Sequence, residues 1–222
     1  MDFKVIAIDG PAGAGKSTIA KKLAGRIGFT YIDSGAMYRA LTLKVLREDI
    51  QFKELDRIIK VAEKTDIDFR DNSIYIDGVL SDTEIREENV NRNVSYVATI
   101  PEVRRLMVEL QRRISKNKNV VMDGRDVGTV IFPSADVKLY ITASVDERAD
   151  RRYRELKEKG YDAEIQDIKS QIEKRDFIDS TREDSPLKAA EDAVIIDTTG
   201  KNIEKVLDEV VSIIKNASVE VH

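Results

Sequence analysis

The sequence predicts an α/β domain of three layers, in which helices cover both faces of a mostly parallel sheet. Two apolar runs, at residues 119–124 and 137–143, are continuous rather than alternating, as in strands that are buried on both faces. Segments with apolar residues at helical spacing separate the strand-like runs, and this alternation is typical of parallel sheets. With 222 residues, the chain is long enough for one such domain, residues 1–222, with an insertion.

The expected elements follow one another in a regular order along the chain. Strands of the sheet are predicted at residues 3–8, 119–124, 137–143 and 193–197. Apolar residues at helical spacing predict helices from the glycine-rich segment to Gly28 and then at 36–47, 55–63, 87–98, 101–114, 145–159, 163–175 and 203–214.

One stretch departs from this order. Residues 67–71 and 73–79 alternate apolar and polar side chains around an Asp-Asn-Ser turn, and this pattern predicts a β-hairpin. We therefore expect the segment 65–98 to be an insertion into the domain.

Composition argues against several classes of function. A net charge of −4 is unlike that of proteins that wrap nucleic acid. MDFKVIAIDG enters a strand pattern at once without signal-peptide features, and no apolar run is long enough to span a bilayer, so we expect a cytoplasmic protein without a membrane role. The chain has no cysteine, and its single histidine is the last residue, His222, so neither a thiolate nor a histidine base is expected.

The strongest functional signal is the glycine-rich loop between the first strand and the first helix. Residues Gly10-Pro11-Ala12-Gly13-Ala14-Gly15-Lys16-Ser17 fit the pattern G-x-x-x-x-G-K-[ST], and Thr18 follows. Backbone N–H groups and the helix dipole of such a loop cradle phosphates. We expect Lys16 to reach the β- and γ-phosphates of ATP and Ser17 to hold Mg²⁺. The predicted fold is therefore a P-loop NTPase fold, rather than a sheet with an unliganded glycine-rich turn.

Arginines predict a second anionic substrate. The base-reading Asn-Lys-x-Asp of GTPases is absent from the sequence. Arginines stand where predicted elements end near the expected cleft, namely Arg39, Arg104, Arg125, Arg148, Arg151, Arg152, Arg175 and Arg182. Such a set suits phosphoryl transfer, in which the protein holds two anionic substrates together. Taken singly, each arginine is better interpreted as a solvated surface residue.

The sequence resembles the bacterial cytidylate kinases, members of the nucleoside monophosphate kinase family, over almost its whole length. The resemblance rests on the hairpin-bearing stretch near 65–98 and on six motifs, GPAGAGKST at 10–18, DSGAMYR at 33–39, SYVATIPEVR at 95–104, DGRDVGTVIFP at 123–133, ASVDERADRR at 143–152 and KRDFIDSTRED at 174–184. It implies ATP- and Mg²⁺-dependent phosphorylation of CMP and dCMP, a nucleotide-binding subdomain at 65–98, and a helical lid at 144–160.

The resemblance also implies roles for individual residues. The acceptor phosphate would be contacted by Ser34, Arg39 and Arg125. Cytosine would be surrounded by Ser95, Arg104 and Asp126. The sugar and phosphate would be contacted by Arg175, Asp179 and Arg182. The lid that closes over ATP would carry Arg148, Arg151 and Arg152, which with Lys16 would be the catalytic groups.

Asp126 is the residue on which specificity would depend. A carboxylate accepts a hydrogen bond from the amino group of cytosine and repels the carbonyl oxygen that uracil has there. Without the resemblance, an ordinary turn aspartate between Gly124 and Gly128 would be the favoured interpretation. Two other functions stay open: a related kinase that prefers UMP or another small acceptor, and a non-catalytic ATP sensor, which the grouped arginines disfavour. We expect a monomer that acts on small molecules.

Overall fold

A computed structural model describes residues 3–70, 73–158 and 160–217 of the chain. It divides into two compact units, which are described separately. The first unit comprises Met1–Tyr31 and Lys118–His222, and the second comprises Ile32–Asn117. His222, the Asp71-Asn72 positions of the expected hairpin turn, and Lys159 of the expected lid lie outside the described residues.

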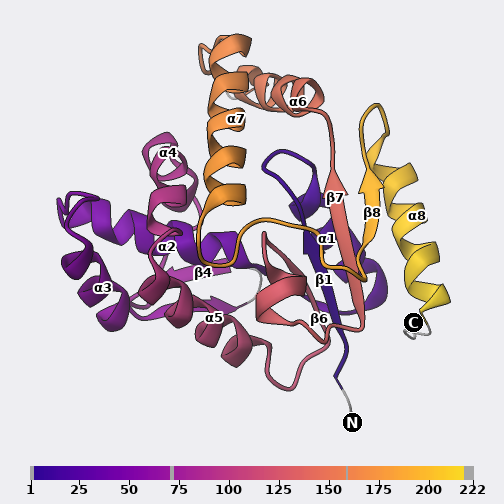
Figure 1. Cartoon of the computed structure of the whole chain (residues 1–222), viewed down its shortest axis with the longest axis horizontal. Helices are drawn as coiled ribbons and strands as arrows, with labels where there is room; N and C mark the ends of the chain where they lie inside the picture. The colour runs from indigo at the N-terminus through magenta and orange to yellow at the C-terminus, as the bar shows by residue number, and fades with distance from the viewer. Residues whose placement is uncertain (1–2, 71–72, 159, 218–222) are drawn as a thin grey trace. The chain divides into compact units, whose positions relative to one another are not determined.

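A five-stranded sheet organises the first unit. Its strands are β1 (Val5–Asp9), β2 (Thr30–Asp33), β6 (Val120–Asp123), β7 (Val137–Thr142) and β8 (Val194–Asp197), in the order β2-β6-β1-β7-β8 (Figure 1). Strand β1 pairs in parallel with β6 and β7, and β7 pairs in parallel with β8. The predicted α/β fold with a mostly parallel sheet is thus confirmed. Strand β2, which the sequence pattern missed, leads the chain into the second unit.

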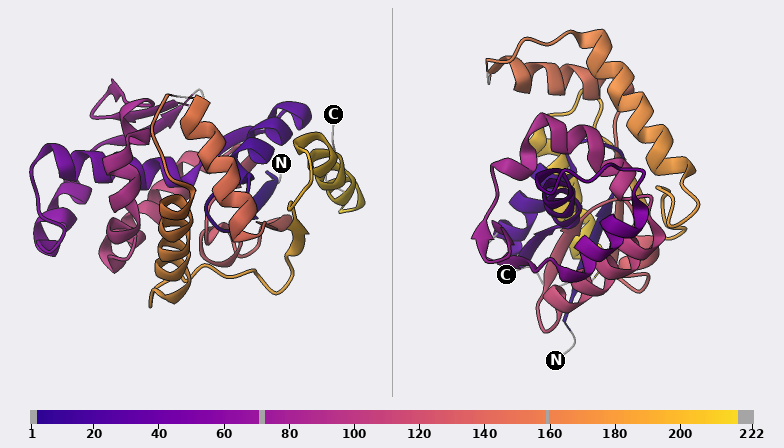
Figure 2. Two further views of the ribbon diagram at one scale, coloured as in Figure 1. Left: turned by 90° about the horizontal axis from the view of Figure 1, so that it is seen from above. Right: turned by 90° about the vertical axis from the view of Figure 1, so that its left-hand side faces the viewer.

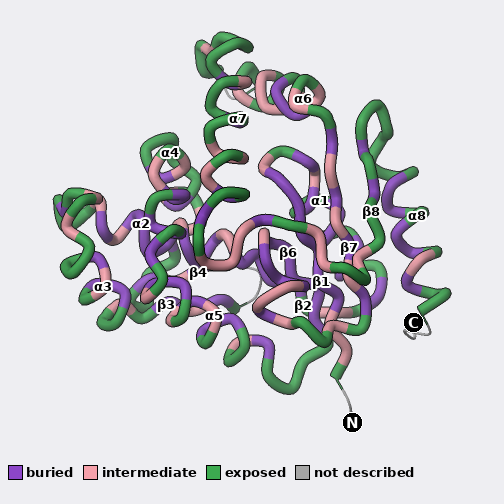
Figure 3. Tube along the Cα trace, in the orientation of Figure 1, coloured by how far each residue is buried: buried purple, intermediate pink, exposed green. Residues whose placement is uncertain are grey.

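Helices α1 (Lys16–Ile27) and α8 (Ile203–Asn216) pack with the sheet in one hydrophobic core. Ile8 and Leu139 from the strands, Leu23 from α1 and Val210 from α8 are among its fully buried side chains. In Figure 3, β1 is buried along most of its length, as its apolar sequence requires.

Two further helices of the first unit, α6 (Val145–Glu158) and α7 (Ile165–Thr181), pack against each other as a hairpin (Figure 2). Ala149, Ile168 and Ile172 form a small core between them. We expected the second of these helices to end at Arg175, but it continues to Thr181. Because no glycine or proline follows until Pro186, nothing in the backbone stops the helix earlier.

The second unit combines helices with a small antiparallel sheet. Its elements are α2 (Ser34–Arg47), α3 (Leu55–Lys64), β3 (Ile67–Arg70), β4 (Ser73–Ile76), β5 (Val79–Leu80), the 3₁₀ turn η1 (Glu84–Arg86), α4 (Glu88–Val97) and α5 (Pro101–Ser115). Strands β3 and β4 pair antiparallel, which confirms the hairpin. The stretch 73–79 is not one strand, however, because Asp77 and Gly78 take left-handed conformations (φ 51° and 79°) and turn the chain back into β5.

The expected insertion, 65–98, lies within the second unit, and its role stays a prediction. Across the residues that the structure describes, no helix has both the length and the apolar character needed to cross a bilayer.

Candidate active site

The glycine-rich loop begins where β1 ends, and its backbone can be formed only with glycine at key positions. Gly10 has φ 144°, and a Cβ atom there would lie 1.9 Å from the carbonyl oxygen of Ile141. Gly13 and Gly15 also have positive φ angles, of 77° and 89°. The loop therefore has the tight curvature that turns backbone N–H groups toward phosphate oxygens.

Lys16, the first residue of α1, is buried, and its ammonium group donates a 2.7 Å hydrogen bond to the carbonyl oxygen of Pro11. Burial, together with the positive charge of Arg125, lowers the pKa of Lys16 to about 7, although Asp123 and Asp9 oppose the shift. A lysine in this position strongly favours an incoming anion, because phosphate oxygens restore the stability of its charged form. Thr18, the last residue of the motif, is exposed in the first turn of the helix.

Ser17 lies beside a carboxylate that the sequence analysis did not identify. Its hydroxyl donates a 2.7 Å hydrogen bond to Asp123 Oδ2, and the Tyr31 hydroxyl donates to the other oxygen at 2.8 Å. A serine hydroxyl and a carboxylate oxygen are ligands that Mg²⁺ uses in P-loop proteins. Although no cluster of three or more acidic, histidine or cysteine residues forms a metal cage in the described chain, Mg²⁺ with a nucleotide needs only one or two protein ligands.

Two of the three arginines predicted for the lid are held against the glycine-rich loop. Arg148 is buried, donates to the carbonyl oxygens of Ala12 (3.0 Å) and Ala143 (3.1 Å), and pairs with Asp176 of α7 at 2.7 Å. Arg151 donates to the hydroxyl and the carbonyl oxygen of Thr198 at 3.0 and 2.7 Å.

Thr198 in turn donates to the carbonyl oxygen of Ala14 at 3.2 Å, so it links Arg151 to the loop. Arg152 differs from the other two arginines. It pairs with Glu155 on its own helix at 2.8 Å, and its side chain is about one-third exposed (35%).

A second charged group of the first unit contains the other predicted residues from this part of the chain. Asp179 Oδ2 lies 2.9 Å from Arg125 Nε and 4.0 Å from Arg175 Nε, and Asp179 Oδ1 lies 4.0 Å from Arg182 Nη1. Burial raises the pKa of the Asp179 carboxyl, but the attraction of the three arginines outweighs it and leaves the pKa below its usual value. Three arginines thus converge on one carboxylate, and guanidinium groups are the donors that bind phosphate oxygens in pairs of hydrogen bonds.

Asp126 is also buried, and one of its oxygens lies 3.7 Å from Arg182 Nη2. It stands directly before a π-helical turn, η2 (Val127–Ile131), but its side chain makes no hydrogen bond to the first N–H groups of that turn. The ordinary role of a turn aspartate is to cap in this way. Asp126 is therefore not used as a cap.

In the second unit, Ser34 begins α2, and Arg39 lies in the second turn of the same helix. Asp33 caps this helix by accepting from the N–H of Ala36 (2.9 Å), and it pairs with Arg39 at 2.7 Å. A side chain at Gly35 would come within 3.1 Å of Arg39 Nη1, so glycine allows the arginine to lie across the first turn. Among the described residues, the buried Nε of Arg39 has no hydrogen-bond partner.

The other two predicted residues of the second unit are buried in α4 and α5. Ser95 lies in α4, and Arg104 of α5 donates to the carbonyl oxygen of Ala98 at 3.0 Å. The guanidinium carbon of Arg104 also lies 5.6 Å from the centre of the Tyr38 ring, within the range of a cation–π contact. Arginine is seldom buried so completely unless it is paired, so Arg104 stays a candidate for ligand binding.

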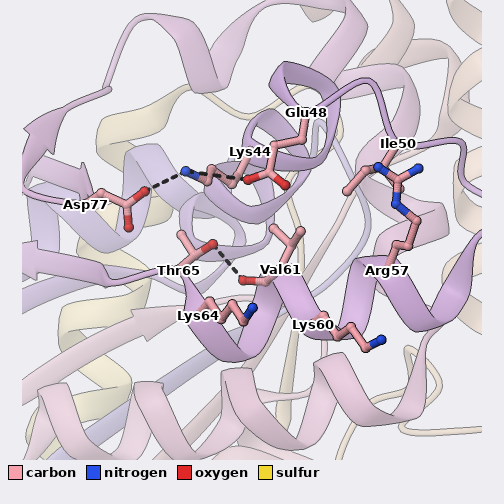
Figure 4. Close-up of a pocket in the computed structure, with 9 residues that line it drawn as sticks. All are labelled: Lys44, Glu48, Ile50, Arg57, Lys60, Val61, Lys64, Thr65 and Asp77. Carbon is pink, nitrogen blue, oxygen red and sulfur yellow. Dashed lines mark hydrogen bonds and ion pairs between the residues drawn. The ribbon is translucent and has the colours of Figure 1, made fainter.

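A cavity of about 270 Å³ in the second unit is lined by none of the predicted residues (Figure 4). Its central cation, Lys44, lies between Asp77 at 2.8 Å and Glu48 at 3.6 Å. The hydrogen bond to Asp77 raises the pKa of Lys44. Because its charge is already paired, we do not assign a nucleotide to this cavity.

Comparisons with known proteins point to one family over almost the whole chain. The family model described as "Cytidylate kinase" matches residues 6–216. A cytidylate kinase of Caldanaerobacter subterraneus subsp. tengcongensis is 53% identical over 210 residues, which cover 95% of this chain and 94% of that protein. One from Alkaliphilus oremlandii is 51% identical over 215 residues, covering 97% and 99%. A crystal structure of an uncharacterized protein from Eubacterium ventriosum has a TM-score of 0.54 at 12% identity, with 97% of this chain and 99% of that one covered, a likeness of fold alone.

Proposed function

The chain belongs to the cytidylate kinase family, and from this premise we propose that it transfers the γ-phosphoryl group of ATP to CMP and dCMP, forming ADP and CDP or dCDP. One observation carries the proposal. The first unit holds two separate groups suited to phosphates, the glycine-rich loop with Lys16 and the three arginines around Asp179. A protein that only sensed ATP would have no use for the second group, whereas a kinase must hold two anionic substrates.

The donor is assigned to the loop Gly10–Thr18. Lys16 would exchange the carbonyl oxygen of Pro11 for oxygens of the β- and γ-phosphates. Ser17 and Asp123 are the residues that would hold Mg²⁺, since their oxygens already lie 2.7 Å apart. When bound, the ion neutralises charge on the phosphates.

The acceptor is assigned to Ser34, Arg39 and Arg125 at its phosphate, to Ser95, Arg104 and Asp126 at its base, and to Arg175, Asp179 and Arg182 at its sugar and phosphate. These residues occur in both units. No side chain has to act as a strong base, because the attacking oxygen belongs to a phosphate that is already anionic. Catalysis by this chain would consist of positioning the two phosphates and neutralising their charge.

The lid assigned to residues 144–160 includes the whole of α6. We propose that α6 must close over ATP for turnover, since excluding water strengthens every interaction with the moving phosphoryl group. The Arg148 and Arg151 contacts support a bracing role at the loop, and the exposed ion pair of Arg152 leaves this residue the most easily redirected toward a phosphate.

A coupled assay of ADP release with ATP, Mg²⁺ and each of CMP, dCMP, UMP, AMP and GMP tests the function directly. We expect rapid release only with CMP and dCMP, and loss of this preference in Asp126→Ala. A preference for UMP would replace the proposed acceptor with that of the rival kinase. Binding of ATP without release in any of the five mixtures would instead indicate a non-catalytic sensor.

We also infer where the protein acts and in which oligomeric state. Its substrates are free nucleotides of the cytoplasm, and the residues assigned to both of them come from one chain, so we propose a cytoplasmic enzyme that works as a monomer. Sedimentation equilibrium over a wide concentration range checks the second point, because a dimer would appear as a mass twice that of the 25.1 kDa chain.

A further inference from the structure

Asp9, the last residue of β1, has no part in the proposed chemistry, and yet it is almost completely buried (4% exposed). Its two carboxylate oxygens accept hydrogen bonds from the backbone N–H groups of Val127 (2.8 Å) and Gly128 (2.7 Å). These are the first two residues of the π-helical turn η2, which follows directly after Asp126. Asp9 therefore caps this turn from a different strand.

Because Asp9 provides this cap, the Asp126 carboxylate does not serve as one. An aspartate that precedes a helical turn usually accepts from the first N–H groups itself, as Asp33 does at α2. At η2 those N–H groups are already taken by Asp9, and Asp126 makes no capping bond. The Asp126 carboxylate is consequently directed to other groups, including Arg182 at 3.7 Å.

Both β1 and the turn contribute to the short distance between Asp9 and the turn. A Cβ atom at Gly128 would lie 3.3 Å from Asp9 Oδ2 and 3.2 Å from Lys138 Cδ. Strand β1 is held on both sides, with Ile8 opposite Asp123 and Asp9 opposite Tyr140. The position of the carboxylate is thus fixed by the centre of the sheet.

This arrangement is electrostatically unfavourable. Burial raises the pKa of the Asp9 carboxyl to about 6, the two N–H bonds oppose the shift, the charge of Asp126 adds to it, and Lys16 opposes it. Burial of a carboxylate that a second carboxylate repels is unfavourable to folding, and such placements are characteristic of functional sites. At neutral pH Asp9 is ionised and can accept both bonds.

We propose that Asp9 is a positioning residue for acceptor selection: it caps the turn Val127–Ile131 in place of Asp126 and so fixes where the Asp126 carboxylate meets the base of the acceptor. This inference rests on the proposed function, because it assigns the recognition of cytosine to Asp126. Asp9 itself touches neither nucleotide. Its substitution should therefore alter the choice of acceptor more than the binding of ATP.

The test compares Asp9→Asn with a matched control. Asparagine has the same shape, but its NH₂ group would face one of the two N–H donors, so one capping bond is lost and a repulsive contact replaces it. We expect the ratio of kcat/KM for CMP over UMP to fall about tenfold or more, while KM for ATP changes by less than about threefold. The control is Asp136→Asn, since Asp136 accepts from the N–H of Val5 (2.8 Å) at the opposite end of the same strand. This control should leave the ratio unchanged.

A double-mutant cycle separates positioning from a general loss of structure. If Asp9 acts through Asp126, adding Asp9→Asn to Asp126→Ala produces no further change in the CMP-to-UMP ratio. Independent, multiplying effects of the two substitutions would overturn the inference. So would an Asp9→Asn enzyme that keeps the wild-type ratio, or one that loses activity equally with every acceptor.

Two other results have a different meaning, namely a variant that does not fold and a wild-type enzyme without a preference. If Asp9→Asn does not fold, Gly128→Ala strains the same bond from the turn, and it should lower the ratio in the same direction; an unchanged ratio would refute the inference. If the wild-type enzyme shows no preference for cytidine nucleotides, the proposed function fails first, and that result is read before any variant is compared.

Discussion

Lys16 illustrates how a single residue of the donor site combines stability with function. Its ammonium group is buried next to Arg125 and depends on the carbonyl oxygen of Pro11 for a hydrogen bond. A carbonyl dipole is a weak substitute for an anion, so the charged form is poorly stabilised while the loop holds no phosphate. A lysine whose pKa is lowered in this way is suited to the anionic ligand that we propose for this loop.

Because the pKa of Lys16 is lowered, we expect this residue to take up a proton when ATP binds. With a pKa of about 7, Lys16 is mostly neutral at about pH 8 in the free protein, and binding of a non-hydrolysable ATP analogue restores its charge. We expect nearly one proton to be taken up at this pH and the analogue affinity to weaken as the pH rises through about 7. Calorimetric titration in two buffers of different ionisation enthalpy measures the uptake.

Lys16→Arg is the control for this experiment, because a guanidinium stays protonated throughout the range. The variant should bind the analogue with no uptake attributable to this position. Equal uptake by the two proteins would assign the proton to another group and contradict the role of Lys16.

Asp179 is the carboxylate that three arginines share, and we expect its removal to destabilise the folded protein. Asp179→Asn leaves Arg125, Arg175 and Arg182 without their shared carboxylate, and loss of one partner from a buried charged group costs about 3 kcal/mol. Because the pKa of Asp179 lies below 3.8, this stabilisation is present above the unfolded-state value and is lost as the pH falls through the lower folded value.

Urea denaturation at several pH values measures this effect. The difference between wild type and Asp179→Asn should be constant near neutrality and should narrow only in acid. Asp192→Asn removes an exposed partner of Lys138 and should leave the unfolding midpoint unchanged. If Asp179→Asn lowers the stability at neutral pH by no more than this control does, the three arginines do not need Asp179.

The residues of the site could be predicted only where a local pattern marks them. The glycine loop, Lys16 and Ser17 follow from a contiguous motif whose spacing is fixed by backbone geometry. Asp9 and Asp123 end two strands, before Gly10 and Gly124, and strand ends at the carboxyl edge of a parallel sheet are a usable signal for a site. Their partners in the turn and at Ser17 are far away in sequence, however, so the roles of both carboxylates required the structure.

At the scale of elements, helix α6 carries two kinds of arginine that the sequence alone could not distinguish. Arg148 is bonded to the glycine-rich loop, whereas Arg152 pairs with a residue of its own helix. Arg148→Ala removes bonds to Ala12, Ala143 and Asp176, and we expect it to destabilise the protein by about 3 kcal/mol. Arg152→Ala breaks one partly exposed ion pair and should change the stability by less than about 0.5 kcal/mol. If this arginine reaches the moving phosphoryl group, the substitution should nevertheless lower kcat about a hundredfold or more.

Thermal denaturation and the ADP-release assay on both variants decide between these roles. The two substitutions remove the same side chain from the same helix, so each serves as the control for the other. A stable Arg148→Ala enzyme with a large loss in kcat, together with a fully active Arg152→Ala enzyme, would exchange the two assignments.

Elements with a strong periodic pattern could be predicted, and those fixed by their neighbours could not. The helices α1 to α6 and α8 and the central strands carry apolar residues at regular spacing, which propensity and burial both favour. Strand β2 has the sequence Thr-Tyr-Ile-Asp, with a single aliphatic residue, and β5 has only two residues, so neither shows a recognisable pattern. The π-helical turn η2 has no local signature, because its first N–H groups are satisfied by Asp9 from β1.

At the scale of the whole molecule, the assigned residues are distributed unequally between the two units. All residues assigned to ATP lie in the first unit, whereas the acceptor is assigned to Arg125, Asp126, Arg175, Asp179 and Arg182 there and to Ser34, Arg39, Ser95 and Arg104 in the second. A ligand stabilises the segments that it contacts against local opening. The two substrates should therefore protect different parts of the chain.

Hydrogen exchange monitored by mass spectrometry tests this distribution. We expect a non-hydrolysable ATP analogue alone to slow exchange in residues 10–18 and in α6, with little change in α2 and α4, because no residue assigned to ATP lies in the second unit. CMP alone should slow exchange both at the beginning of α2 and around residues 125–131. Arg39→Ala should remove the first of these effects, while Arg57→Ala, an exposed arginine of α3, serves as the control. Protection of only one unit by CMP would show that half of the acceptor residues are wrongly assigned, since a nucleotide held by all of them must order both segments.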